Sequence, residues 1–222
     1  VARYLGPEQF GLLSYLVALV TILSTISRLG FDSILIREFT QSPNTASANL
    51  RAGAGLMIPA ALMAGIGVVT LFYVTDPENQ SLAILAAFMI FLQPVVIIDW
   101  FYQSKLQARV TVQIRIAAIA ISSALKVVAV MMKLSLFSFV LIGVVELLIV
   151  SALYLVVFFR AKRVSAEAGE NVARAKLLFR MSWPLLISAV ASILYMKIDQ
   201  SMVKALIGNY QEGLYSAAAK FN

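Results

Sequence analysis

The chain has 222 residues, of which 61% are hydrophobic and 13% are charged, and its formal net charge is +7. An ordinary soluble domain is about 45–50% apolar and about 25% charged, so this composition indicates a protein whose solvent is lipid. The sequence contains neither cysteine nor histidine, which excludes disulfides, thiolate nucleophiles, Cys/His zinc sites and imidazole acid–base catalysis.

Six segments are long and apolar enough to cross a bilayer, whose core of about 30 Å takes about 20 helical residues. They lie roughly at 11–36, 52–74, 81–103, 111–132, 134–159 and 181–207. The predicted fold class is therefore all-α, a polytopic membrane protein. The connections are short except for the polar stretch 160–180.

Basic residues gather on one side of these spans. The side reached after the first, third and fifth spans holds Arg37, Arg51, Lys105, Arg109, Arg160, Lys162, Arg163, Arg174, Lys176 and Arg180. The opposite side holds Arg3 and Lys133. Because cytoplasmic loops are enriched in Lys and Arg, we expect the first side, with the stretch 160–180, to be cytoplasmic. The positive charge is then a topology signal, and we expect no nucleic-acid partner.

A short motif occurs near both ends of the chain. Gly6, Gly11, Leu12 and Ser14 recur, each 202 residues later, as Gly208, Gly213, Leu214 and Ser216. An even number of crossings between the copies gives two halves of the same orientation. We expect a first lobe at 1–159 without its first helix, a cytoplasmic linker at 160–180, and the start of a second lobe at 181–222. The chain then looks like a fragment; a chance match is the alternative.

Charged side chains inside spans cost at least about 2.5–3.5 kcal/mol on insertion scales, so each is a candidate for a functional site. Arg28 and Asp32 lie four residues apart and should pair on one helix face. Together with Thr21, Ser24 and Thr25 they form a polar stripe. The stripe is either a cavity wall or a structural ion pair at the interface.

Glu146 lies near the middle of the span 134–159 and is the most costly charge. At about 1.5 Å per residue it lies about 16–18 Å from the outer end of its helix, against about 9–10 Å for Lys126. A lysine side chain can bend across much of that difference, so we expect a Lys126–Glu146 pair. The pair is either structural, or Glu146 is a proton or cation site and Lys126 a contact for anionic substrate.

Three further charges interrupt the last span. Lys197 and Lys204 share one helix face, whereas Asp199 points the other way and needs a partner from elsewhere or an aqueous cavity. The alternative for the lysines is snorkelling to the interface. Asp99 lies beside three aromatic residues, for which an aromatic belt is the simpler explanation, and Arg115 is expected only to anchor its helix.

Proline and small residues indicate kinks and close helix packing. Pro59, Pro94 and Pro184 fall inside or at the edge of spans, where proline frees a carbonyl. We expect Gln93 to satisfy part of the backbone freed by Pro94. The stretch 52–67 is rich in glycine and alanine, which indicates close packing or a hinge.

Three stretches resemble a known family: "ARYLGPEQFGLLSY", "RLGFDSILIREF" and "SWPLLISAVASILYMKIDQSMVKALIGNYQEGLYSAAAKF". They are similar to the bacterial polysaccharide flippases, the exporters of O-antigen (for lipopolysaccharide) and exopolysaccharide in the multidrug/oligosaccharidyl-lipid/polysaccharide superfamily. The resemblance covers essentially the whole chain. It implies an alternating-access transporter of twelve or more helices in two lobes, in the bacterial inner membrane. It also implies an acidic position of the seventh helix at Asp199.

The implied substrate is an oligosaccharide on polyprenyl pyrophosphate, moved from the cytoplasmic to the periplasmic leaflet, with other polysaccharide assembly proteins as further partners. Arg28, Lys126 and Lys197 are our candidates for binding the pyrophosphate. Asp32, Glu146 and Asp199 would pair with them or carry a coupling H⁺ or Na⁺. Two alternatives are a multidrug exporter of the same superfamily, which the mixed buried charges disfavour, and a membrane polysaccharide polymerase, which the short loops disfavour. We expect a transporter rather than an enzyme, with no cofactor and no metal.

Overall fold

The computed structural model describes residues 2–160 and 171–207, with the backbone alone at residues 2–3, 171, 196–201 and 203–207. All elements in these ranges are helices, so the all-α prediction is confirmed. The order is α1 (Ala2–Ser27), α2 (Phe31–Gln41), η1 (Pro43–Thr45), α3 (Ala46–Thr75), η2 (Pro77–Asn79), α4 (Gln80–Phe91), η3 (Gln93–Val96), α5 (Ile97–Ser104), α6 (Ala108–Met131), α7 (Leu136–Arg160) and α8 (Asn171–Ile207).

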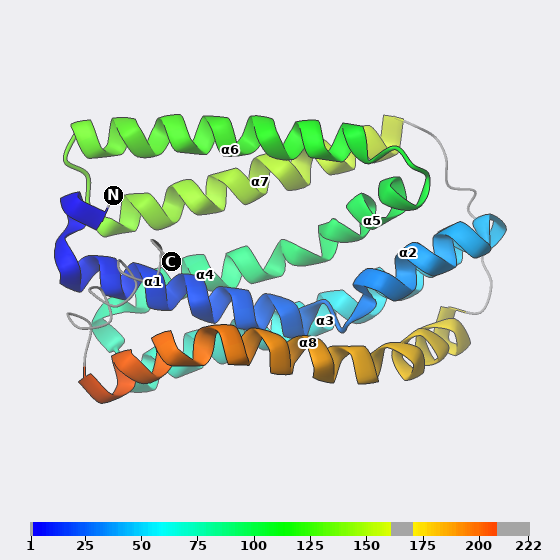
Figure 1. Ribbon diagram of the computed structural model, residues 1–222, viewed down its shortest axis with the longest axis horizontal. Coiled ribbons are helices and arrows are strands. Elements are labelled where there is room, and N and C mark those ends of the chain that lie inside the picture. Colours follow the sequence, from blue (N-terminus) through cyan, green and yellow to red (C-terminus); the bar gives the residue numbers. More distant parts are fainter. Residues whose placement is uncertain (1, 161–170, 208–222) are drawn as a thin grey trace.

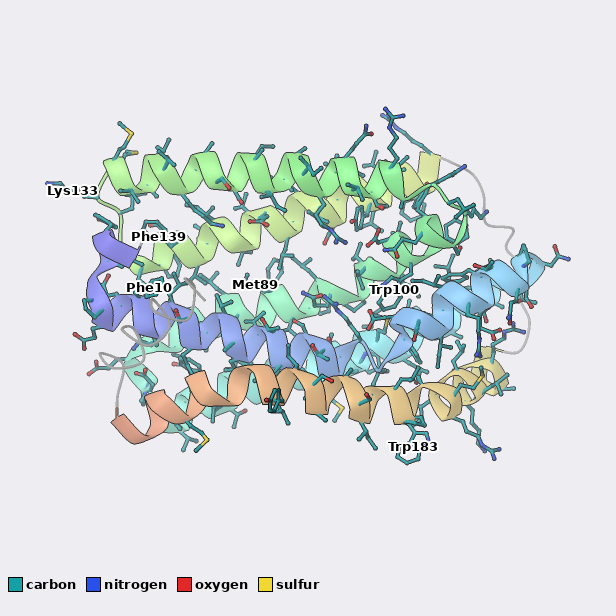
Figure 2. All side chains as sticks on the ribbon, viewed as in Figure 1. Phe10, Met89, Trp100, Lys133, Phe139 and Trp183 are labelled. Atoms are coloured by element: carbon teal, nitrogen blue, oxygen red, sulfur yellow. The ribbon has the colours of Figure 1, made fainter. Side chains whose placement is uncertain are left out.

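Six helical segments of the described chain are long and apolar enough to cross a membrane, as predicted. They run side by side, and the chain reverses direction between successive segments (Figure 1). The turn from α2 to α3 and the turn from α5 to α6 lie at the same end of the bundle. We call it the basic end, because Arg37, Lys105 and Arg109 are there. The turn at Lys133 lies at the opposite end (Figure 2).

The first predicted span is not one helix. α1 ends at Ser27, Leu29 and Gly30 have φ angles of 56° and 67°, and α2 begins at Phe31. Gly30 packs tightly against α8: a Cβ on Gly30 would lie 2.6 Å from the backbone nitrogen of Leu186 and 2.9 Å from the backbone oxygen of Ser182. Only glycine combines this left-handed conformation with so close an approach at little cost. The prediction of a continuous helix over 11–36 is therefore wrong.

The third predicted span is also broken. α4 ends at Phe91, and the 3₁₀ turn η3 carries Pro94 before α5 begins at Ile97. Proline removes a helical hydrogen bond and its ring clashes with the carbonyl four residues earlier, which explains the interruption. Pro59 and Pro184, by contrast, lie inside helices that continue past them.

Small residues of α3 serve close packing on one side only. A Cβ on Gly53 would lie 2.8 Å from Cδ1 of Ile97, and a Cβ on Gly65 would lie 3.4 Å from Cβ of Ala87. A Cβ on Gly55 or on Gly67 would have no neighbouring atom within 4 Å. The packing interpretation of the stretch 52–67 is thus confirmed for Gly53 and Gly65, while the other two glycines face outward.

The two breaks divide the apolar core into two clusters. One contains Phe10, Phe72, Ile90 and Phe139 and is built largely by α1, α3, α4 and α7. The other contains Phe31, Leu35, Phe101, Tyr154 and Leu178 and belongs to α2, α3, α5, α7 and α8. Phe10 and Phe139 lie near the end opposite the basic end, whereas Trp100 lies in the basic half (Figure 2).

The last helix begins at Asn171, so the described residues 171–180 of the predicted linker are helical. α8 packs against α1, α3 and α2. At the basic end its Arg174 donates to Oδ1 of Asn49 and to Oγ1 of Thr45, both at 2.7 Å, and lies 4.0 Å from Glu38. Asn49 is fully buried. Arg174, which the sequence indicated only as a topology signal, thus fastens α8 to the turn between α2 and α3.

We expect Arg174→Ala to lower the melting temperature of the full-length protein in detergent. The change leaves the carbonyl of buried Asn49 without its donor, and an unsatisfied buried group costs about 1–3 kcal/mol. Lys176→Ala is the matched control, because Lys176 is an exposed cation on the same helix. Equal melting temperatures for the two variants would contradict the fastening role of Arg174.

Candidate functional site

A cavity of about 390 Å³ lies between the two helix breaks and the α6–α7 hairpin. Its lining carries four charged side chains, two arginines and two carboxylates. The lining residues are Arg28, Leu92, Gln93, Val95, Val96, Asp99, Trp100, Gln103, Arg115, Ile119, Glu146, Leu147, Val150, Ser151 and Tyr154. All of them belong to the segment expected to form the first lobe.

Arg28 connects the two breaks. It lies in the turn between α1 and α2, and its terminal Nη2 donates to Oε1 of Gln93 at 2.9 Å. Gln93 begins η3, the turn that interrupts the third span. The sequence had suggested that Gln93 satisfies part of the backbone freed by Pro94. Its side chain instead accepts a hydrogen bond from Arg28.

A second arginine of the cavity is held by a carboxylate. Nη2 of Arg115 on α6 donates to Oδ2 of Asp99 on α5 at 2.7 Å, and Nε2 of Gln103 donates to the same oxygen at 3.0 Å. The Asp99 side chain is only 5% exposed. Tyr154 of α7 faces Arg115, although its hydroxyl lies outside hydrogen-bonding geometry.

This pair corrects two interpretations from the sequence. Trp100, Phe101 and Tyr102 are buried in the protein and do not form a belt at the lipid interface. Arg115 does not only anchor α6, because it neutralises a buried carboxylate next to the cavity. Asp99 and Arg115, for which the sequence indicated only an aromatic belt and a helix anchor, are therefore further candidates for the site.

The predicted pair of Lys126 and Glu146 is confirmed. Nζ of Lys126 on α6 lies 3.5 Å from Oε2 of Glu146 on α7. The hydroxyl of Ser122, one helical turn before Lys126, donates to the same oxygen. Glu146 lines the cavity. This carboxylate is therefore held by two donors on α6 while one of its sides is open to the polar space.

The predicted pair of Arg28 and Asp32 is not formed. The helix breaks between the two residues, which places Asp32 in the first turn of α2, beyond the turn that holds Arg28. Asp32 makes no ion pair within the described residues. A carboxylate at a helix N-terminus is stabilised by the helix dipole. The position of Asp32 therefore has a structural explanation that needs no partner cation.

The remaining candidates belong to the last helix. Lys197, Asp199 and Lys204 belong to α8, but their side chains lie outside the described residues. The second copy of the glycine motif, at 208–216, also lies outside them. Their predicted roles remain predictions.

Comparison with known proteins decides the family. The family model described as "Polysaccharide biosynthesis protein" matches residues 1–222. The chain belongs to this family. It is the family of polysaccharide and O-antigen flippases of the multidrug/oligosaccharidyl-lipid/polysaccharide superfamily, so the predicted resemblance is confirmed. Comparisons with curated proteins and with solved structures gave no match.

The cavity brings charges of both signs together. The guanidinium groups of Arg28 and Arg115 line the cavity together with the carboxylates of Asp99 and Glu146. Arginine presents several donors in a planar fork, which matches phosphate oxygens. Arg115 is already paired with Asp99, whereas Arg28 is held by a neutral amide. Arg28 is therefore the better placed of the two to bind an added anion.

Proposed function

We propose that this protein is a flippase that moves oligosaccharide repeat units on polyprenyl pyrophosphate from the cytoplasmic to the outer leaflet for O-antigen or exopolysaccharide synthesis. The observation that carries the proposal is the polar cavity between two interrupted membrane helices, with Arg28 at the junction. Transporters commonly build substrate sites from discontinuous helices near the middle of the bilayer. Membership of the polysaccharide biosynthesis family supports the same assignment.

The proposal assigns the pyrophosphate to the cationic side chains. Arg28 is its principal contact, Arg115 joins it when its pairing with Asp99 loosens, and Lys126 and Lys197 remain candidates. The cavity of about 390 Å³ suits the charged group, while the sugar and the polyprenyl chain stay outside it. Glu146, Asp199 and Asp32 pair with these cations or carry a coupling H⁺ or Na⁺. No enzymatic step and no cofactor is proposed.

The proposed setting is the bacterial inner membrane, with the basic end in the cytoplasm. Arg37, Lys105, Arg109 and Arg160 support this orientation, since cytoplasmic ends are enriched in basic residues. α8 would be the first helix of a second lobe, joined to the first on the cytoplasmic side by the residues between α7 and α8. Its packing against α1, α2 and α3 is then a contact between lobes.

A multidrug exporter of the same superfamily is the second candidate. The observation that favours it is that Asp99, Glu146, Trp100 and Tyr154 line the same cavity, because carboxylates and aromatic rings suit organic cations. The two candidates differ in which charges matter. A flippase needs Arg28, whereas an exporter of cations needs Glu146 or Asp99 and tolerates the loss of Arg28.

The test measures lipid-linked sugar in cells that lack the intact parent gene. We expect repeat units on polyprenyl pyrophosphate to accumulate in the cytoplasmic leaflet, and the intact gene to reverse the accumulation. Arg28→Gln at normal membrane abundance should restore less than a tenth of transport. No accumulation, with altered sensitivity to cationic drugs, would instead establish the exporter.

Ion coupling is tested by Glu146→Gln and Asp199→Asn. We expect each change to abolish transport while the protein remains at normal abundance in the membrane, because an amide cannot take up and release a proton. Glu78→Gln is the control, since Glu78 is an exposed carboxylate of the turn η2. Full activity of both Glu146→Gln and Asp199→Asn would contradict coupling through these residues.

A further inference from the structure

We propose that Gln93 is a positioning residue that orients Arg28 toward the cavity without neutralising its charge. The inference rests on the proposed function, because it concerns the same anion site. It assigns a role to a neutral residue that lies on a different span from Arg28, and it explains why an amide rather than a carboxylate meets the guanidinium.

Arg28 has little else to fix its side chain. It sits in the turn after α1, where its backbone nitrogen bonds to the oxygen of Ser24 at 3.1 Å and its own oxygen accepts from Phe31 at 3.0 Å. Its Nε is buried and has no hydrogen-bond partner. In the described part of the chain, Gln93 is the one side chain that hydrogen-bonds to Arg28. The direction of the guanidinium is therefore set from η3.

Gln93 is itself held in a defined place. The nitrogen of Leu92 bonds to the oxygen of Phe88 at 3.2 Å, and the nitrogen of Val95 bonds to the oxygen of Leu92 at 3.3 Å. Pro94 adds a fixed φ angle immediately after Gln93. This tight turn presents the Gln93 amide to the facing break, so that its Oε1 lies 2.9 Å from Nη2 of Arg28.

The chemistry of the acceptor decides the charge of the cavity. Arg115 is compensated by Asp99, and Glu146 by Lys126. Arg28 makes no ion pair within the described residues, and the carboxylate of Asp32 acts on it only through longer-range electrostatics. A glutamine carbonyl orients a guanidinium without neutralising it, whereas a carboxylate would do both. Gln93 thus leaves the Arg28 guanidinium without a carboxylate in direct contact, so that an added anion can pair with it.

The experiment measures binding of inorganic pyrophosphate to the purified full-length parent protein by calorimetry. We expect Arg28→Gln and Gln93→Glu each to weaken binding at least tenfold, the first by removing the charge and the second by neutralising it. Gln93→Leu should weaken binding about fivefold to tenfold through lost orientation, the size expected for the net contribution of one ordinary hydrogen bond. Gln113→Leu is the matched control, because Gln113 is exposed on α6 and outside the cavity lining.

A double variant separates positioning from a general structural effect. If Gln93 acts through Arg28, Gln93→Leu should weaken binding no further in the Arg28→Gln background. Gln93→Met keeps the length of the side chain without the acceptor and replaces Gln93→Leu if that variant is not monodisperse. Additive losses, or unchanged affinity of Gln93→Glu beside a weakened Arg28→Gln, would overturn the positioning role and leave the proposed function standing. A wild-type protein that binds no pyrophosphate would overturn both.

Discussion

Gly30→Ala should prevent the full-length protein from folding to normal yield. The φ angle of Gly30 is 67°, and the left-handed region costs a non-glycine residue about 1–2 kcal/mol. The added Cβ would also lie 2.6 Å from the backbone nitrogen of Leu186, a distance that α8 can relieve only by moving as a whole. Together these effects place the loss at about 2–5 kcal/mol, which is large for the addition of a single methyl group.

Two other glycines provide matched controls for this substitution. Gly55 and Gly67 lie in α3, and nothing lies within 4 Å of a Cβ built on either. Alanine favours a helix over glycine by up to about 1 kcal/mol, so Gly55→Ala and Gly67→Ala should leave stability unchanged or raise it. Yield of monodisperse protein and melting temperature in detergent measure all three. A Gly30→Ala protein as stable as Gly67→Ala would show that α8 does not press against the α1–α2 break.

Arg115→Met is the second change with a large expected effect. It removes the cation from Asp99, whose side chain is 5% exposed, and leaves Gln103 as the remaining donor to that carboxylate. Removing one partner of a buried ion pair costs about 3–5 kcal/mol. Adding Asp99→Asn should restore most of the lost stability, because a neutral amide needs no counterion.

The stability of four full-length proteins tests this account: wild type, Arg115→Met, Asp99→Asn and the double variant. Arg109→Met is the control, since Arg109 is an exposed arginine near the start of the same helix. We expect the melting temperature of Arg115→Met to fall well below that of Arg109→Met. If the stability losses of Asp99→Asn and Arg115→Met add up in the double variant, the ion pair is not what holds α5 to α6.

Contacts between consecutive helices were the part of the site that sequence could predict. Lys126 and Glu146 flank a tight turn, so the rise per residue fixes their depths from a common end, and the structure pairs them at 3.5 Å. The same arithmetic places Asp99 five residues before the end of α5 and Arg115 seven residues after the start of α6, at similar depth. That pair was predictable, and attributing Asp99 to an aromatic belt concealed it.

Contacts that depend on the helix breaks could not be predicted from the sequence pattern. The pairing of Arg28 with Asp32 assumed 3.6 residues per turn across Leu29 and Gly30, where the backbone turns left-handed. Glycine is often tolerated inside membrane helices, so its presence alone did not reveal a break. The partner that Arg28 does have, Gln93, lies 65 residues away on a span that is not its neighbour in the chain. Apolar length predicts that a segment crosses the membrane, but not where its helix stops.

The place of α6 in the bundle links the site to the lipid around it. α6 packs mainly against α7, with a smaller contact to α5, yet it carries Arg115 and Lys126. Large apolar side chains of α6, among them Ile116, Leu125 and Val127, are exposed, so this helix presents an apolar surface to the surrounding lipid. A mismatch between the apolar length of a membrane helix and the thickness of the bilayer is accommodated by tilting or kinking of the helix or by local deformation of the bilayer. One wall of the cavity is therefore positioned by the membrane as well as by the protein, so that acyl-chain length becomes a variable of the site's geometry.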